Sequence, residues 1–356
     1  MIYPWQADLW NRLQAGRGRL PHALLLVGPQ GLGKRRFAEV LAQGLLCEQP
    51  AADGFPCGQC VSCAWVAAGT HPDLRLLVPE SEAEEAPNEA EAEPVSAAKP
   101  KKASSQIRIE QVRALTDFAS LGTHRGGFRV ILADPAEAMN AYTANALLKL
   151  LEEPNPSTLF LMISHSPRRL LATIRSRCQT IDLPRPDPAA ATAWLQQQTG
   201  AADVAGVLAF CGGMPLAAQT LAGADASACR EQFVAAVQDP GRSDPLRVAA
   251  LWEGWCKRKP EAGFAVSLAM LADWLQKWVF DLALWKSAGR VMFHPGRERA
   301  IERLVAGVAF ANLAACYNEL LRIKRIAEHP LNPRLFLEDM LLRYGRAVAA
   351  GGTVDG

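Results

Sequence analysis

The apolar positions of this chain follow two different spacings, and the change between them divides the sequence. Up to about residue 183, short continuous apolar runs alternate with segments in which apolar residues recur every three or four positions. Runs of the first kind are typical of buried parallel strands, and the second spacing is typical of helices. Beyond residue 188 the helical spacing continues alone. The pattern predicts a doubly wound, parallel α/β domain followed by a helical region.

Five apolar runs predict the strands of the sheet, at residues 24–27, 74–78, 128–133, 159–164 and 181–183. Helices are expected at 34–46, 107–119 and 143–153, with a short amphipathic helix inside residues 1–18. Pro154 ends the third of these helices. A short helix is also expected to begin at Ser166-Pro167.

Changes of composition predict the domain boundaries. A proline-rich hinge at 184–188 closes the α/β part, so we expect domains at 1–185, 186–225 and 226–356. Residues 80–106 consist mainly of Glu, Ala, Pro, Ser and Lys, which bury too little apolar surface to offset ordering entropy. We therefore expect a disordered surface insertion at about 80–106.

Composition limits the broad class of protein. The chain has 356 residues, 49% of them hydrophobic and 21% charged, with a formal net charge of +2. Its bulk charge therefore gives no sign of nucleic-acid or membrane binding. We find neither a signal-peptide pattern nor a bilayer-spanning apolar window, so we expect a cytoplasmic protein with no membrane partner. In a reducing compartment, clustered members of the nine cysteines indicate a metal rather than disulfides.

A glycine-rich stretch after the first predicted strand matches a phosphate-binding loop. Gly28, Gly31, Gly33 and Lys34 stand at the positions where backbone N–H groups and an ammonium bind phosphate. The next position should be Ser or Thr, whose hydroxyl ligates Mg²⁺, but it is Arg35, which can only donate hydrogen bonds. The stretch predicts a phosphate loop that lacks its metal ligand, with doubtful nucleotide binding.

Four cysteines follow the helix after this loop, and they predict a structural metal site. Cys57, Cys60 and Cys63 are separated by two residues each, a spacing that lets all three sulfurs reach one ion, and Cys47 can supply a fourth. Four thiolates leave no coordination position for a catalytic water, so zinc here should be structural. His71 is the reserve ligand if Cys47 is not used.

The third predicted strand ends at Asp134, for which two roles are open. It stands where a Mg²⁺-directed aspartate follows a strand in phosphate-loop ATPases, although Pro135 occupies the place expected for a catalytic carboxylate. Asp134, Pro135 and Glu137 also have the spacing of a helix-capping box. We favour the capping role.

Taken together, these motifs resemble the bacterial replicative clamp-loader subunits of the AAA+ family. The resemblance covers nearly the whole chain outside 80–106. Its marks are the degenerate phosphate loop, the four cysteines, and the segments Tyr3-Pro4-Trp5, 69–73 (Gly-Thr-His-Pro-Asp), 145–154 (Asn-Ala-Leu-Leu-Lys-Leu-Leu-Glu-Glu-Pro) and Ser176-Arg177-Cys178. The cysteines combined with the altered loop single out the delta-prime type.

The resemblance implies a fold and a role. The fold would be an AAA+ RecA-like domain carrying the zinc module at 47–63, then a small helical lid domain and a helical collar. Arg177 would act in trans as an arginine finger on the ATP of a neighbouring subunit. The chain itself would not hydrolyse ATP, since Arg35, Pro135 and Pro215 replace a metal ligand, a base and a sensing arginine. Its partners would be subunits of the gamma/tau and delta types in a hetero-pentamer that loads the sliding clamp onto primed DNA.

Two other functions remain as alternatives at this point. The chain could be an ATP-hydrolysing motor of the same family, or a zinc-dependent nucleic-acid-binding module, although the cysteine segment has few basic or aromatic neighbours. In the helical region, Trp274, Trp278 and Trp285 fall on one side of a helix. Either core packing or a subunit interface would explain these tryptophans.

Overall fold

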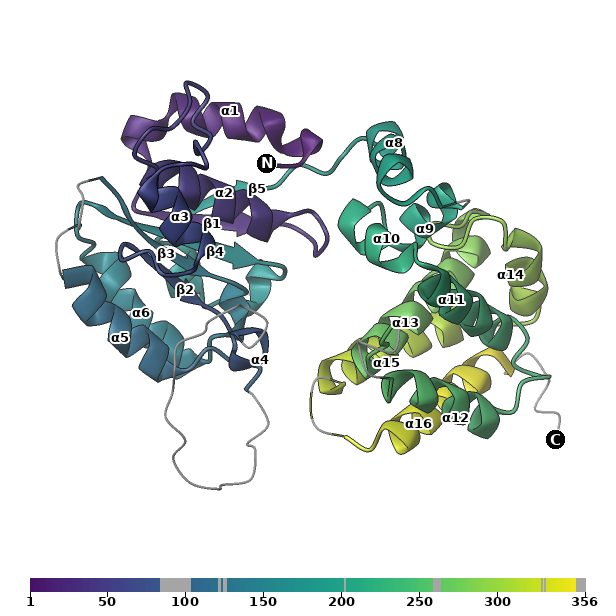
Figure 1. The fold of residues 1–356 in the computed structure, drawn as a ribbon. Coiled ribbons are helices and arrows are strands. Elements are labelled where there is room, and N and C mark those ends of the chain that lie inside the picture. Colours follow the sequence, from purple (N-terminus) through teal and green to yellow (C-terminus); the bar gives the residue numbers. More distant parts are fainter. Residues whose placement is uncertain are drawn as a thin grey trace. The chain divides into compact units, whose positions relative to one another are not determined.

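The computed structural model describes residues 1–83, 104–120, 123, 127–201, 203–258, 264–327, 329 and 331–349. The chain forms two compact units, Met1–Pro186 and Asp187–Gly356 (Figure 1). The first unit contains the sheet and the second is helical. A further division of the helical unit at residue 225 stays a prediction.

The sheet of the first unit has five strands in the order β2-β3-β4-β1-β5, and every neighbouring pair is parallel. The strands are β1 (Ala23–Val27), β2 (Leu74–Leu77), β3 (Arg129–Ala133), β4 (Thr158–Ser164) and β5 (Gln179–Asp182). All residues of β1, β3 and β4 are buried, which explains their continuous apolar runs. The predicted parallel α/β sheet is confirmed.

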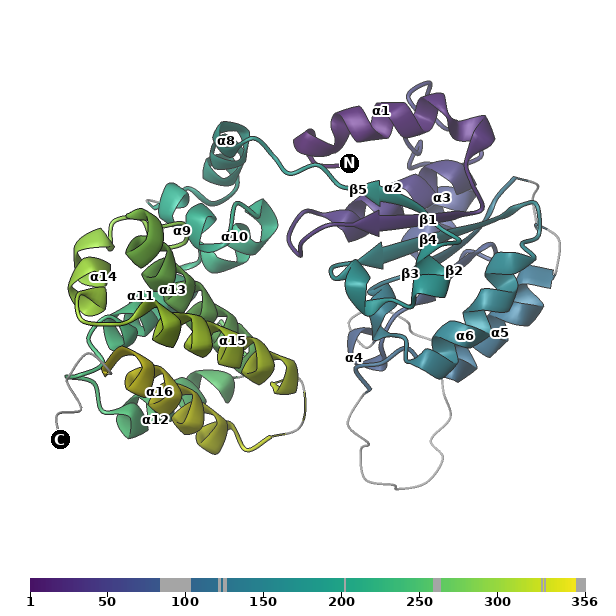
Figure 2. The ribbon, with the colours of Figure 1, turned by 180° about the vertical axis from the view of Figure 1, so that it is seen from behind.

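Helices cover both faces of this sheet (Figures 1 and 2). Leu25, Ile131 and Phe160 pack in one core cluster with residues of α5 and α6. Leu24 and Leu26 point the other way, toward the side of α2, because successive side chains of a strand alternate. The helices are α1 (Ala7–Ala15), α2 (Lys34–Leu46), α3 (Val61–Ala67), α4 (Glu80–Ala83), α5 (Ile109–Ser120), α6 (Ala141–Glu152) and α7 (Ala172–Arg175). Four 3-10 turns join them, at η1 (Pro4–Gln6), η2 (Arg17–Arg19), η3 (Ala136–Ala138) and η4 (Pro167–Arg169).

The two ends of the expected insertion at 80–106 are ordered. Glu80–Ala83 forms the single turn α4, and Glu80 pairs with Arg108 at 2.7 Å. The backbone N–H of Ser81 donates to the carbonyl of Ser104. The expectation of disorder is wrong at these ends because they bond to each other and to the start of α5. Residues 84–103, where the rest of the insertion falls, lie outside the described residues.

The second unit is built from helices around one extended core, whose buried residues run from Ala191 to Val348. The helices are α8 (Pro188–Thr199), α9 (Val204–Phe210), α10 (Pro215–Leu221), α11 (Ala224–Val237), α12 (Pro245–Cys256), α13 (Leu268–Ala288), α14 (Glu298–Val305), α15 (Phe310–Ile326) and α16 (Pro333–Ala349). Several begin at an Asp or Ser whose side chain caps the first turn, such as Asp187 and Ser267. Within the described ranges, no single helix is long and apolar enough to cross a membrane, although two bent helix pairs pass that test when joined.

The tryptophans of α13 belong mainly to this core. Trp274 and Trp278 are buried, and Trp285 is partly buried against the same cluster. The indole N–H of Trp278 donates to the hydroxyl of Tyr344 at 2.9 Å, and that hydroxyl donates to the carbonyl of Val237 at 2.5 Å. This pair of bonds links α13, α16 and the end of α11. Core packing is therefore confirmed for Trp274 and Trp278.

Candidate functional site: a phosphate loop, a cysteine cluster and an exposed arginine

The glycine-rich stretch forms the turn between β1 and α2. Gly28, Gly31 and Gly33 all have φ between +80° and +150°, a range that side chains with a Cβ rarely adopt. At Gly33 a Cβ would also lie 2.4 Å from the ring of Tyr3. Gly33 is the N-cap of α2 and offers no side chain to the first N–H groups of that helix. Local backbone geometry therefore accounts for the glycines of the motif.

Lys34 is buried beneath this loop, with 3% of its surface exposed. Its ammonium donates to the carbonyl of Gly28 at 2.6 Å and to that of Pro29 at 2.8 Å. Burial lowers the pKa of Lys34 to about 8, although the carboxylates of Asp134 and Glu137 act in the opposite direction. Lys34 thus bonds to backbone carbonyls of the loop, which stabilises the loop conformation. It also keeps a cation next to the loop N–H groups.

The N-terminal segment supports the loop from the other side. The indole N–H of Trp5 donates to the carbonyl of Leu32 at 3.1 Å. The buried amide of Gln6 donates to the carbonyls of Leu32 and Gly33 at 2.9 and 3.1 Å. Tyr3 and Trp5 stack on each other with their ring centroids 5.0 Å apart. The conspicuous Tyr3-Pro4-Trp5 start of the chain therefore belongs to the loop, a contact that sequence spacing could not reveal.

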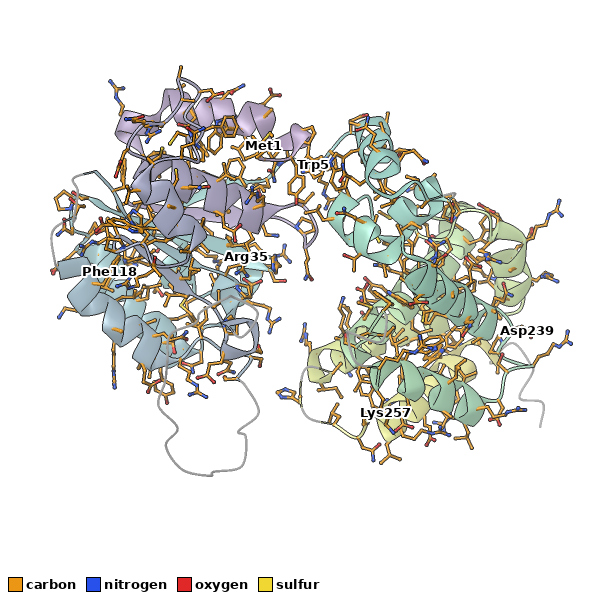
Figure 3. All side chains as sticks on the ribbon, in the orientation of Figure 1. Met1, Trp5, Arg35, Phe118, Asp239 and Lys257 are labelled. Atoms are coloured by element: carbon orange, nitrogen blue, oxygen red, sulfur yellow. The ribbon has the colours of Figure 1, made fainter. Side chains whose placement is uncertain are left out.

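Arg35, which is labelled in Figure 3, stands where a Ser or Thr would ligate Mg²⁺. Its guanidinium faces Asp134. Its Nη1 lies 3.7 Å from Oδ2 of Asp134, and its Nε donates to Glu39 at 3.1 Å. Asp134 is 5% exposed at the end of β3. A fixed positive charge therefore lies beside the carboxylate that would be directed at Mg²⁺ in an ATPase of this architecture.

The capping role favoured for Asp134 is wrong. The turn after β3 is the 3-10 segment η3, whose N-cap is Pro135 and which has no side-chain capping bond. Glu137 Oε1 instead accepts from the backbone N–H groups of His165 and Ser166, at 2.8 and 3.0 Å. Asp134 and Glu137 face the phosphate loop because the carboxyl ends of β1, β3 and β4 meet at one edge of the sheet.

The four cysteine sulfurs lie together between α2 and α3. They are all within 4.8 Å of one another, and Cys47 Sγ is 3.5 Å from Cys57 Sγ and 3.8 Å from Cys60 Sγ. Sulfurs bound at about 2.3 Å around a tetrahedral ion would be about 3.8 Å apart. The four residues Cys47, Cys57, Cys60 and Cys63 therefore fit a tetrahedral metal ion as a set.

Backbone N–H groups point at several of these sulfurs. Cys57 Sγ accepts from the N–H groups of Gln59 and Cys60, and these bonds lower the pKa of Cys57 to about 6. Cys60 Sγ caps α3 by accepting from the N–H of Cys63 at 3.4 Å. Burial raises the pKa of Cys63 to about 12. The N–H groups favour thiolates, which is the form in which cysteine ligates a metal.

His71 lies away from this cluster and is not one of its ligands. Its Nε2 lies 2.9 Å from the hydroxyl of Ser62, and its Nδ1 accepts from the N–H of Asp73 at 3.0 Å. The ring is buried, with 4% of its surface exposed. The proposal that His71 replaces Cys47 is therefore wrong, since both ring nitrogens are already bonded.

Arg177 follows the short helix α7 and leads into β5. Its Nη1 donates to the carbonyl of Thr173 at 2.9 Å, and its Nη2 lies 2.5 Å from Glu152 Oε1. The side chains of Arg177 and Glu152 are 35% and 49% exposed. Such a pair is held weakly, because solvent-exposed ion pairs contribute about 0–1 kcal/mol.

Arg177 and the phosphate loop lie at opposite edges of the sheet. β1 and β5 are parallel, with Leu24 opposite Gln179 and Val27 opposite Asp182. Arg177 precedes the first residue of β5, whereas the loop follows the last residue of β1. A five-residue strand spans about 17 Å, so Arg177 is too far away to act on a phosphate bound at its own chain's loop.

The arrangement of the sheet and the loop identifies the fold class of the first unit. An inner strand of a parallel sheet, β1, leads into a glycine-rich loop, a buried lysine and a helix N-terminus, which is the architecture of the phosphate-loop fold. Residues 5–187 match the family model "DNA polymerase III, delta subunit", and residues 227–345 match "DNA polymerase III, delta subunit, C terminal".

Comparison with curated proteins gives the family more narrowly. A DNA polymerase III subunit delta' from Pseudomonas aeruginosa is 42% identical over 79% of this chain and 77% of its own length. One from Yersinia pestis is 30% identical over 98% of this chain and 97% of its own length. The chain belongs to the delta-prime family of DNA polymerase III subunits. Among solved structures, a gamma subunit-related protein from Thermotoga maritima has a TM-score of 0.43 at 16% identity, covering 96% of this chain and 99% of that one.

The buried position of Lys34 predicts a pH dependence of stability. Lysine titrates near 10.4 in an unfolded chain and at about 8 here, so the unfolded state binds more protons between those values. The contribution of Lys34 to the free energy of unfolding should therefore rise by about 2 kcal/mol between pH 8 and pH 10. Denaturant unfolding at both pH values, compared with Lys34→Met, measures this increment. Equal changes in parent and variant would show that Lys34 does not titrate in this range.

Proposed function

We propose that this chain is the non-hydrolysing delta-prime subunit of a replicative clamp loader. It would occupy one end of a hetero-pentamer with gamma/tau-type and delta-type subunits. That complex loads the sliding clamp onto primed DNA in the cytoplasm, as part of the DNA-directed DNA polymerase holoenzyme. The first unit would be the AAA+ domain and the second would comprise the lid and collar. The observation that carries this proposal is the separation of Arg177 from the phosphate loop of its own chain.

Arg177 would act on the ATP of a neighbouring subunit. The parallel sheet places it at the edge opposite to its own loop, so any nucleotide that it contacts must come from another chain. Its guanidinium is partly exposed, and a weak surface ion pair with Glu152 holds it. A γ-phosphate has a higher charge than a carboxylate and matches the planar guanidinium fork, so it can replace Glu152 as the partner.

The chain itself would not turn over ATP. Hydrolysis in phosphate-loop enzymes needs Mg²⁺ bound by the loop hydroxyl and by the carboxylate after the third strand. Arg35 removes the hydroxyl and places a cation 3.7 Å from Asp134, which opposes a divalent ion by like-charge repulsion. The loop keeps the glycines and the lysine that bind phosphate. It would still not support hydrolysis, because it could not hold Mg²⁺.

The cysteine cluster would hold one structural Zn²⁺. The support is chemical and geometric, because four sulfurs lie at tetrahedral spacing and backbone N–H groups stabilise their thiolate forms. The ion would join the end of α2 to α3 and stabilise the loop between them. Trp10 contacts this loop by stacking on the ring of Phe55, with the two ring centroids 4.4 Å apart. Four protein ligands leave no position for substrate, so the ion would take no part in catalysis.

Metal analysis of the purified chain should find one zinc per chain. Cys60→Ser should lose the metal and lower the midpoint of thermal unfolding, because structural zinc contributes directly to folding free energy. Cys256→Ser, which removes a thiol from the second unit, is the matched control and should retain the metal. A parent chain with full stability and no bound zinc would rule out the site.

The isolated chain should show no measurable Mg²⁺-dependent ATP hydrolysis. Arg35→Thr restores one missing metal ligand but leaves Pro135 in place of the base, so it should not create an ATPase. Hydrolysis by the parent chain that disappears on Lys34→Ala would instead identify an ATP-hydrolysing motor. Salt-dependent DNA binding by the isolated chain, lost on removal of zinc, would identify the nucleic-acid-binding alternative.

Arg177→Ala should leave folding nearly intact but lower ATP turnover at the neighbouring subunit's site in the reconstituted complex. An arginine finger contributes roughly 10³–10⁵ in rate in well-studied systems, so turnover at that site should become very slow, and clamp loading should decline with it. Arg177→Lys should rescue poorly, because an ammonium lacks the bidentate fork. Turnover assays with clamp and primed DNA measure the effect.

Arg175→Ala is the control for Arg177→Ala, since Arg175 is exposed, lies two residues away and is outside the Ser-Arg-Cys segment. It should turn over ATP like the parent. Parental turnover and clamp loading by Arg177→Ala complexes would disprove the role in trans. Failure of those complexes to assemble would make Arg177 an interface residue instead.

A further inference from the structure

A buried row of hydrogen bonds connects the sheet to the cysteine cluster. It starts on β3, passes through the turn before β2 and the helix α3, and ends at the last residue of α2. Its members are Arg129, Asp73, His71, Ser62 and Leu46. The side chains of the first four are at least 95% buried. Each of these buried side chains has a hydrogen-bond partner within the row, which meets the general requirement that buried polar groups be bonded.

The hydrogen bonds from Asp73 to Leu46 determine which atom of each pair carries the proton. The backbone N–H of Asp73 donates to Nδ1 of His71, so in the neutral ring the remaining proton is on Nε2. That N–H donates to the hydroxyl oxygen of Ser62, 2.9 Å away. The single hydroxyl proton of Ser62 then points to the carbonyl of Leu46, at 2.6 Å. The donor sequence therefore fixes both the imidazole tautomer and the hydroxyl rotor.

The Ser62 hydroxyl joins the two segments that carry the cysteine ligands. Ser62 lies on α3 between Cys60 and Cys63, and Leu46 immediately precedes Cys47 at the end of α2. A bond from Ser62 to Leu46 therefore sets the distance between these two segments before any ion is present. His71 holds the hydroxyl in the orientation that this bond needs.

The other end of the row is anchored in the sheet. The guanidinium of Arg129 pairs with the carboxylate of Asp73 at 3.1 Å, and it also donates to the carbonyl of Phe118 on α5. Asp73 leads into β2, and Arg129 is the first residue of β3. The position of His71 is thereby tied to two strands of the sheet as well as to the cysteine module.

We propose that Ser62 and His71 are positioning residues for the metal ion. They hold the Cys47 end of α2 at the correct distance from α3, which carries Cys60 at its N-cap and Cys63. This inference rests on the zinc site of the proposed function. In this interpretation the segment Thr70-His71-Pro72-Asp73 supports the metal-binding module. Outer partners that orient metal ligands typically contribute 10–100-fold to metal affinity.

The test measures zinc release from the full chain to the chelator 4-(2-pyridylazo)resorcinol, well below the unfolding temperature. Ser62→Ala removes the hydroxyl bond and should release zinc about tenfold faster. His71→Gln keeps an amide donor near the position of Nε2 and should release zinc close to the parental rate. His71→Asn keeps an acceptor for the Asp73 N–H but cannot reach Ser62, so it should resemble Ser62→Ala. Gln59→Ala, an exposed change inside the module, is the matched control and should not alter the rate.

Two spectra separate positioning from a general loss of stability. Cobalt(II) in place of zinc reports ligand geometry, so its visible absorption bands should shift in Ser62→Ala and His71→Asn and stay parental in His71→Gln. Long-range ¹H–¹⁵N correlation of the parent imidazole should show a neutral ring with the proton on Nε2. This measurement does not depend on any variant folding.

The outcomes distinguish the two levels of the proposal. A parent chain that binds neither zinc nor cobalt disproves the metal site, and the positioning role is overturned with it. A parent that holds zinc, with Ser62→Ala and His71→Asn releasing it at the parental rate, disproves the positioning role alone. An imidazole protonated on Nδ1 would also overturn it, since the donor sequence would then run the wrong way.

Discussion

Parallel pairing of β1 with β4 and β5 is the constraint on which the functional geometry depends. It sends the carboxyl ends of all strands to one edge of the sheet, so the phosphate loop, Asp134 and Glu137 share that edge. It also sends Arg177 to the other edge, through its place just before β5. The phosphate loop and Arg177 therefore lie too far apart to contact the same phosphate group.

Arg35 places a positive charge beside Asp134 at the phosphate loop, while the loop itself is held by bonds to its backbone carbonyls. Lys34 keeps its contacts with Gly28 and Pro29, and the N-terminal segment holds Leu32 and Gly33 by their carbonyls. These contacts involve backbone atoms, so they do not require Mg²⁺. A loop held in this way can contribute to the stability of the sheet without a bound metal ion.

Much of the fold follows from local sequence, and the remainder depends on contacts between distant residues. The strands, the loop glycines and the four cysteines were predictable because each depends on the order of apolar runs or on a short spacing. The role of Asp134 was mispredicted because its spacing fits a capping box, while its actual neighbour, Arg35, is almost a hundred residues away. His71 was mispredicted as a reserve ligand for the same reason. Its partner Ser62, and Arg129, which reaches it through Asp73, are not part of any local spacing pattern. The support of the loop by Trp5 and Gln6 likewise depends on a contact across more than 25 residues.

The Tyr344 hydroxyl also bears on the order in which the chain folds during synthesis. The first unit ends at Pro186, so its whole core is available while the second unit is still being made. The core of the second unit includes Tyr344 and Val348, and α11 and α13 meet their partner on α16 last of all. At about 5–20 residues per second, roughly 10–30 s separate the completion of the two sets of core residues. During that interval the apolar surfaces of α12 and α13 that pack against α16 stay uncovered, and transiently exposed apolar surface of this kind favours aggregation.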